Sequence, residues 1–110
     1  MSFVADPFTA IAEPRRREIL EALFEGEKPV GALVSGLSLA QPQVSKHLRV
    51  LSEVGLVRSR ADGRRRLYSV DPSGLAPLRD WLTKYEQALS DRLNRIDDYL
   101  KELQRQGETQ

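Results

Sequence analysis

The sequence predicts a mainly α-helical domain that carries a single β-hairpin. Apolar side chains recur every three or four residues over most of the chain, which is the spacing of helices with one buried face. The period changes to two between Val57 and Val70, around the pair Asp62–Gly63, as in two strands joined by a tight turn. Proline and glycine residues separate these segments, so most element boundaries can be predicted.

Length and composition are those of an ordinary globular protein. With 110 residues, 40% of them hydrophobic and 30% charged, the chain is expected to form a single domain over residues 1–110 with one modest core. No apolar run approaches the roughly 18 residues of a membrane span, and the N-terminus lacks a basic-then-apolar signal sequence. The absence of cysteine excludes disulfides, thiolate metal sites and thiol switches, and is typical of an intracellular protein.

Two helices are predicted near the N-terminus. Asp6–Pro7 and Glu13–Pro14 each combine an N-cap residue with a proline in the first turn, so each should begin a helix. Gly26 lies where the second helix is expected to end. The buried face of that helix is expected to consist of Ile19, Leu20, Leu23 and Phe24.

A third short helix is predicted after Pro29, ending at Gly36, and another follows within three or four residues. Its start is left open, because Ser38 has capping-box spacing to Gln41 whereas Pro42 favours a start nearer Gln41. The apolar stripe of this helix is Val44, Leu48 and Leu51. Its opposite side carries Pro42, Ser45, Lys46 and Arg49, with Gln43 beside them. Residues of about 29–54 therefore have the pattern of a helix-turn-helix.

The hairpin follows directly, over about residues 56–71, and it is basic. Residues 41–70 carry seven basic and two acidic side chains, a net charge of +5, whereas residues 1–40 and 71–110 each carry a net charge of −2. This concentration of positive charge in a nearly neutral protein predicts a local contact with a polyanion, although a basic patch without a partner is the alternative. A basic hairpin after a helix-turn-helix is the wing of a winged helix-turn-helix.

A long helix is expected from about residue 73 to residue 105, after the start signal Asp71–Pro72. A helix of about 30 residues spans about 45 Å, which is more than this domain can cover, so we expect a second chain to cover half of the apolar stripe. Packing against the core of its own chain explains only the N-terminal half. The stripe is Leu75, Leu78, Leu82, Tyr85, Leu89, Leu93, Ile96, Leu100 and Leu103, with Trp81 beside it.

Three stretches in this order, AIAEPRRREILEAL, QPQVSKHLRVLSEVGLV and RADGRRRLYSVDP, closely resemble the ArsR-type winged-helix repressors of bacteria over about residues 6–75. The resemblance implies a homodimer formed through the first and last helices, bound to an inverted-repeat operator in its own promoter, in the cytoplasm and associated with the nucleoid. The reading helix would be Gln41–Val54 and the wing Arg58–Val70. The implied dimer interface contains Phe8, Ile11, Leu78, Trp81, Leu82, Tyr85, Leu89, Leu93 and Ile96.

The sequence departs from the metal-sensing members of that family. Those members use cysteine pairs beside the reading helix or Asp, His and Glu sets on the last helix, whereas this chain has no cysteine and its only histidine is His47. One histidine does not make a site of three or four ligands. We therefore expect no metal and no cofactor, a packing role for His47 with a phosphate contact, and a place in the metal-free branch of the family.

The expected DNA-binding residues are Gln41, Gln43, Ser45, Lys46, His47, Arg49, Arg64, Arg65 and Arg66. Glutamine can pair in bidentate fashion with adenine, and serine can meet a base or a phosphate. For Gln41 and Gln43 the alternative is a role in capping and solvating the helix. Lys46 and Arg49 suit phosphates, with Arg49 also able to read guanine.

At the wing, Arg64 and Arg65 suit an A/T-rich minor groove, and Arg66 could instead pair with a nearby carboxylate. The alternation predicts that Arg64 and Arg66 share one side of the hairpin. At the other end of the chain, Arg15, Arg16 and Arg17 begin a helix, where the macrodipole disfavours cations. They are expected either to meet a phosphate or to form ordinary ion pairs, for example between Arg17 and Glu13 or Glu21.

An enzyme is not expected, because no nucleophile with an orienting base and no phosphate-binding glycine loop is present. The sequence thus predicts a DNA-binding repressor whose partners are double-stranded DNA and a second copy. Two alternatives remain. One is a winged helix that serves as a protein-interaction module, and the other is a regulator whose small-molecule effector binds between the last helices near Trp81.

Overall fold

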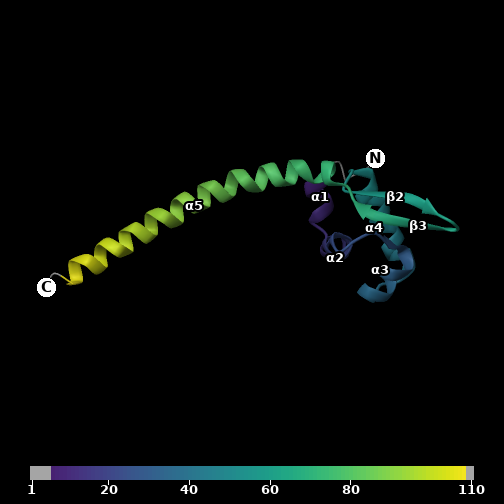
Figure 1. Ribbon diagram of the computed structural model, residues 1–110, viewed down its shortest axis with the longest axis horizontal. Helices are drawn as coiled ribbons and strands as arrows, with labels where there is room; N and C mark the ends of the chain where they lie inside the picture. The colour runs from purple at the N-terminus through teal and green to yellow at the C-terminus, as the bar shows by residue number, and fades with distance from the viewer. Residues whose placement is uncertain (1–5, 109–110) are drawn as a thin grey trace. The chain divides into compact units, whose positions relative to one another are not determined.

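The computed structural model describes residues 6–108, and the chain falls into two compact units, Met1–Leu78 and Arg79–Gln110. The prediction of a mainly helical winged helix-turn-helix is confirmed. The elements in chain order are α1 (Pro7–Ile11), α2 (Pro14–Phe24), β1 (Lys28–Pro29), α3 (Val30–Leu37), α4 (Gln41–Glu53), β2 (Val57–Asp62), β3 (Arg65–Val70) and α5 (Pro72–Glu108) (Figure 1).

The first two helices begin where the sequence predicts. Asp6 Oδ1 accepts a hydrogen bond from the backbone N–H of Thr9 at 2.9 Å, and Glu13 Oε1 accepts one from the N–H of Arg15 at 3.0 Å. In both helices a proline occupies the first turn, where its missing N–H costs no hydrogen bond. Because α2 begins with its own N-cap directly after α1 ends, the two segments form separate helices and the chain changes direction between them.

The sheet has three strands rather than the two predicted. β1 pairs with β3 in antiparallel register, Lys28 with Tyr68 and Pro29 with Leu67, so the strand order is β1-β3-β2 with β3 in the centre. No local pattern predicts β1, because a strand of two residues has no periodicity and forms only against a distant partner. Pro29 therefore ends a strand as well as preceding α3.

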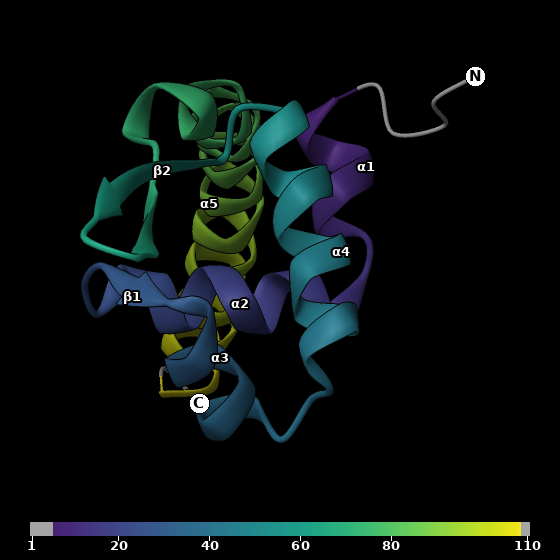
Figure 2. The same ribbon diagram turned by 90° about the vertical axis from the view of Figure 1, so that its right-hand side faces the viewer.

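One core holds the first unit together. In Figure 2, α4 runs beside α1, and it also contacts α2 and α3. One face of the sheet closes this core. The buried residues are Ala10, Ile19, Leu20, Leu23, Leu33, Val44, Leu48, Leu51, Leu56, Val57 and Leu78, with Tyr68, Val70 and Leu75 packed against them. Phe24, expected on the buried face of α2, is 61% exposed.

The ends of the helix-turn-helix differ partly from the prediction. α3 continues past Gly36 to Leu37 and ends with Ser38 in the left-handed conformation, at φ 55°. Ser38 therefore terminates α3 and does not cap α4, which begins at Gln41 after Ala40. The predicted stop at Gly55 is correct, since α4 ends at Glu53 and Gly55 follows with φ 80°.

The start of α5 packs closely against the turn after α4. Asp71 Oδ1 accepts hydrogen bonds from the Ser73 N–H at 3.1 Å and from the Ser73 hydroxyl at 2.7 Å. A Cβ on Gly74 would lie 1.7 Å from the carbonyl oxygen of Gly55. Glycine at position 74 therefore lets the helix backbone touch the turn directly, and α5 then extends to Glu108, three residues beyond the expected end.

Candidate nucleic-acid interface

Helix α4 presents a polar face to solvent and an apolar face to the core, as predicted. Val44, Leu48 and Leu51 are at most 1% exposed. Of the six residues on this helix that are predicted to contact DNA, His47 is partly exposed. The other five are exposed: Gln41, Gln43, Ser45, Lys46 and Arg49. The buried stripe fixes the rotation of the helix, so these five side chains point outward together.

The first turn of α4 already uses one of its glutamines. Gln43 Oε1 accepts a hydrogen bond from the backbone N–H of Ala40 at 3.2 Å, which satisfies a donor that the helix start leaves open. A bidentate contact with adenine needs both the oxygen and the nitrogen of the amide. Because an amide oxygen has two lone pairs, Gln43 can keep this helix-capping bond and still offer its second lone pair and its amide nitrogen to adenine. The side chain of Gln41 makes no hydrogen bond within residues 6–108.

His47 lies on the side of α4 that faces the start of α2. Its Nδ1 and the Nε of Arg16 are both shielded from solvent and have no hydrogen-bond partner among the described residues. Burial lowers the pKa of His47, the positive charges of Arg16 and Lys46 lower it further, and Glu13 opposes them. The imidazole is therefore held neutral near pH 7.

The three arginines at the start of α2 divide their roles. Arg15 pairs with Glu18, Nη1 to Oε2 at 3.0 Å, and Arg17 Nη1 donates a hydrogen bond to the carbonyl oxygen of Ile11 at 2.7 Å. The alternative of ordinary ion pairing is therefore realised by Arg15 with Glu18, whereas the example pairing of Arg17 with Glu13 or Glu21 is not formed within residues 6–108. Arg17 instead ties α2 to the end of α1, and the Glu13 carboxylate accepts the hydrogen bond from the Arg15 backbone N–H.

The hairpin turn lies one residue later than the sequence predicted. Asp62 pairs with Arg65, so the two residues of the loop are Gly63 and Arg64. Gly63 has φ 65°, whereas no described non-glycine residue of the hairpin has a positive φ. Glycine in the first loop position alone is the requirement of a type II′ turn. Arg64 consequently lies at the tip of the wing rather than on a strand.

Two of the wing arginines are neutralised by carboxylates. Arg65 Nη2 lies 3.3 Å from Asp62 Oδ2, across the base of the turn. Arg60 makes a bidentate pair with Glu27, with Nε to Oε2 and Nη2 to Oε1 both at 2.8 Å. The carboxylate nearest the turn is taken by Arg65, and the alternative of a carboxylate pair for Arg66 is not realised within the described residues. Arg64 and Arg66 are exposed.

The residues predicted at a dimer interface fall into two groups. Leu78 is 8% exposed in its own core and Ile11 is half-buried against it, whereas Phe8 is 39% exposed. Along the second unit, the predicted residues are each 47% to 57% exposed: Trp81, Leu82, Tyr85, Leu89, Leu93 and Ile96. The rings of Trp81 and Tyr85 lie 4.7 Å apart at 45°. Tyr99, Leu100 and Leu103 prolong this exposed stripe.

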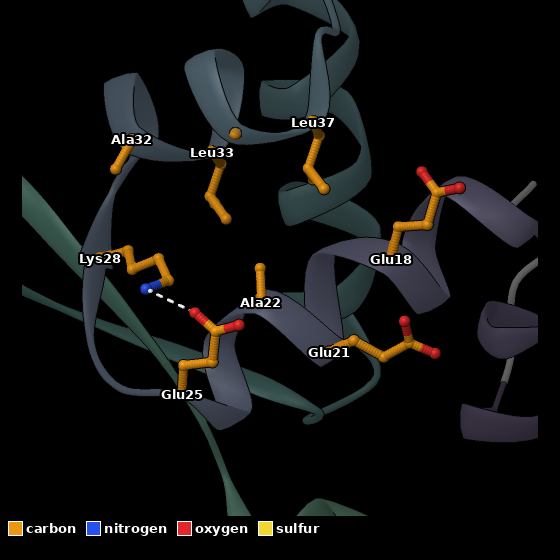
Figure 3. Close-up of a pocket in the computed structure, with 9 residues that line it drawn as sticks. Glu18, Glu21, Ala22, Glu25, Lys28, Ala32, Leu33 and Leu37 are labelled. Carbon is orange, nitrogen blue, oxygen red and sulfur yellow. Dashed lines mark ion pairs between the residues drawn. The ribbon is translucent and has the colours of Figure 1, made fainter.

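A pocket of about 400 Å³ lies between α2 and α3 (Figure 3). Its apolar wall includes Ala22, Leu33 and Leu37, and its acidic side carries Glu18, Glu21 and Glu25. Glu25 pairs with Lys28, Oε2 to Nζ at 3.4 Å. Glu18 is likewise paired, with Arg15, so Glu21 is the carboxylate of this group that forms no ion pair within residues 6–108. The pocket lining offers no unpaired cation to a polyanion among these residues.

Glu27, the partner of Arg60, is a residue of this surface that the sequence does not predict. The two residues are 33 positions apart, and no local pattern links them. The position of Glu27 directly before Lys28–Pro29 indicates a contact with the wing only if Lys28–Pro29 is known to pair with β3. The structure describes no group of three or more His, Asp or Glu side chains that could hold a metal ion. None of the helices within residues 6–108 is long and apolar enough to cross a membrane.

Comparison with known proteins identifies the family. The model of the bacterial regulatory proteins of the arsR family matches residues 13–59, which contain α2, α3 and α4. An HTH-type transcriptional regulator of Mycobacterium tuberculosis, Rv2034, is 45% identical over 76 residues, which are 69% of this chain and 71% of that protein. The chain belongs to the ArsR family. An ArsR-family protein is a DNA-binding transcriptional regulator and not an enzyme.

Solved structures of ArsR-family type share the fold. The crystal structure of a possible transcriptional regulator for arsenical resistance is 39% identical to this chain, with a TM-score of 0.65, over 76% of this chain and 92% of that one. A Mycobacterium bovis domain, Mb0332, is described as a homodimeric winged helix-turn-helix DNA-binding domain. It is 30% identical, with a TM-score of 0.60, over 76% of this chain and 73% of that one.

Proposed function

We propose that this ArsR-family regulator is a homodimeric repressor that binds an inverted-repeat operator in its own promoter. Helix α4 of each protomer would enter a major groove, and the two helices would lie about one DNA turn, or about 34 Å, apart. The observation that carries the proposal is the division of α4 into a fully buried apolar stripe and an exposed face of amide, hydroxyl and cationic groups. Occupation of the promoter would block the polymerase.

Base contacts and phosphate contacts would come from different parts of this surface. Gln41 and Gln43 lie in the first turn of α4, the part of a recognition helix that meets base edges. Lys46 and Arg49 are exposed further along and suit phosphates. Arg64 at the tip of the wing suits the minor groove. Because most of the affinity would come from phosphates, binding should weaken steeply with salt.

The exposed stripe of α5 supports the homodimer. Leucine, isoleucine and aromatic side chains recur at steps of three and four residues from Trp81 to Leu103, and all of them are at least 45% exposed. A stripe with this spacing on a helix is typical of a seam between helices. The homodimeric Mycobacterium bovis domain makes a second copy of this chain the partner we propose.

Fluorescence anisotropy with a labelled duplex from the chain's own promoter tests the function. We expect tight binding at low salt, at least about 1,000-fold tighter than to a scrambled duplex, and a steep loss of affinity as salt rises. Equal binding to both duplexes would contradict an operator-specific repressor. In that case a screen for partner proteins would test the alternative role as an interaction module.

A further inference from the structure

The bidentate pair between Glu27 and Arg60 connects two parts of the first unit that are distant in sequence. Glu27 lies between α2 and β1, whereas Arg60 lies in the middle of β2. Both nitrogen–oxygen distances are 2.8 Å, and a bidentate arginine–carboxylate pair fixes orientation as well as distance. Within residues 6–108, the other ion pairs join residues at most four positions apart.

The pair reaches across the central strand of the sheet. Since the strand order is β1-β3-β2, the residue that precedes β1 and a residue of β2 lie on opposite sides of β3. In the register, Leu67 of β3 is opposite both Pro29 and Arg60. Leu67 is only 7% exposed although it lies on the face of the sheet that points away from the main core. Residues opposite one another in an antiparallel register share a face of the sheet, so Arg60, Leu67 and Pro29 lie on the same face.

Both partners carry the charge that the pair requires. The hydrogen bond from Arg60 lowers the pKa of Glu27, and the same bond raises the pKa of Arg60. Both groups are thus fully charged at neutral pH. Arg60 is held by the carboxylate of Glu27. It therefore has less freedom to contact a phosphate than Arg64 or Arg66 has.

We propose that Glu27 is a positioning residue for DNA binding. By pairing with Arg60 of β2, it holds the wing against the segment between α2 and β1, and we call this pair the clamp. Arg60 is accordingly a structural cation, and the wing contacts DNA through its other arginines. This inference rests on the proposed DNA-binding function for its affinity readout, although the clamp itself can be measured without DNA.

The variant Glu27→Gln distinguishes the clamp from simple electrostatics, because the two predict changes of opposite sign. Removal of a negative charge beside the wing should strengthen DNA binding if Arg60 is merely one more cation. If Glu27 positions the wing, Glu27→Gln should weaken operator binding, by about threefold or more. The matched control is Glu21→Gln, which removes the same charge from α2 at a carboxylate for which no ion pair is formed within the described residues.

A double variant in which the two charges are exchanged tests whether DNA binding can be restored. Glu27→Arg combined with Arg60→Glu restores opposite charges at the same two positions and should return the affinity to within about twofold of the original. Each reversal alone should weaken binding more than Glu27→Gln does. Failure of the double variant to recover, while it stays folded, would overturn the clamp.

Hydrogen exchange without DNA separates this proposal from the proposed function. In Glu27→Gln, the amides of β2 and β3 should exchange at least about threefold faster than in the original chain, whereas those of α4 should not change. Unchanged wing protection, or tighter DNA binding by Glu27→Gln, would overturn the clamp. If the original chain fails to distinguish its operator from a scrambled duplex, the proposed function fails, and the exchange result still decides whether Glu27 holds the wing.

Discussion

Gly74 at the start of α5 and the carbonyl of Gly55 after α4 are in direct backbone contact, with room for no side chain between them. A Cβ at position 74 would lie 1.7 Å from the Gly55 oxygen and 2.5 Å from its carbonyl carbon. The contact joins the end of the reading helix to the first turn of the long helix. Because both partners are backbone atoms, a side-chain rotation cannot relieve a clash there.

The first prediction is that Gly74→Ala destabilises the first unit by about 3 kcal/mol. The added methyl group must push the start of α5 away from the turn. Denaturant unfolding of the variant should show the loss as a lower midpoint. The control is Gly31→Ala in α3, where a Cβ meets nothing within 4 Å. This control should be neutral or stabilising by up to about 1 kcal/mol, and an equal loss in both variants would contradict the argument.

The second prediction separates the two roles of Gln43. Gln43→Glu keeps an oxygen that can accept the hydrogen bond from the Ala40 N–H, and a negative charge suits a helix N-terminus. Stability should therefore be equal or slightly higher. Operator binding should fall by at least about tenfold, because a carboxylate then faces the DNA. Gln43→Ala should instead lose about 0.5–1 kcal/mol of stability. Undiminished operator binding by Gln43→Glu would place position 43 away from the bases.

The third prediction concerns Arg64 at the tip of the wing. Arg64→Ala should weaken binding and reduce the slope of log K against log salt by about 0.9, the contribution of one phosphate contact. Its unfolding midpoint should not change, because the side chain is exposed and makes no ion pair within residues 6–108. Lys101→Ala, which removes a cation from α5, serves as the control and should leave the slope as it is. An unaltered slope for Arg64→Ala would mean that the tip does not touch DNA.

The fourth prediction is a pH dependence that comes from His47, the chain's single histidine. Burial lowers its pKa below the ordinary 6.5, so the unfolded chain takes up the proton first as the pH falls. Stability should therefore be full above about pH 6.5 and should decline as the pH falls from there towards the folded pKa. His47→Gln should abolish this component of the decline. A titration by NMR with a midpoint above 6.5 would contradict the sign.

The fifth prediction tests the seam on α5. Leu89→Glu places a charge in the middle of the exposed apolar stripe, where Leu89 is 57% exposed. Sedimentation should show that dimerisation weakens by at least about 30-fold, and binding to a full operator should weaken with it. Ser90→Glu introduces the same charge one position along and off the stripe, and should leave the dimer intact. Equal behaviour of the two variants would rule out a seam at Leu89.

Elements with a repeating pattern and a local stop signal could be predicted from the sequence. The buried stripe of α4 follows from the spacing of Val44, Leu48 and Leu51, and the helix ends where Gly55 takes a positive φ. The outward face of α4 follows directly from that stripe, so most predicted contacts on this helix are exposed as expected. The hairpin could also be predicted, since its alternation and its glycine are local features.

Features that depend on distant partners could not be predicted. β1 consists of two residues that become a strand only because Tyr68 and Leu67 pair with them. Ser38 has the spacing of a cap for α4, yet the chain places it in the left-handed conformation that ends α3. The carboxylate partner of Arg60 is likewise far away in sequence. In each case the local pattern permits more than one outcome, and tertiary contacts decide between them.

The pairing of Lys28 with Tyr68 has a consequence for how the chain folds. Both helices of the helix-turn-helix lie between these two residues in sequence, and β3 also pairs with β2. The third strand can therefore be added only after a long loop has closed, which makes it a late, entropically costly step. Because α4 lies inside this loop, the hairpin and α4 should unfold together in one cooperative transition. A peptide that contains only the wing should remain largely unstructured.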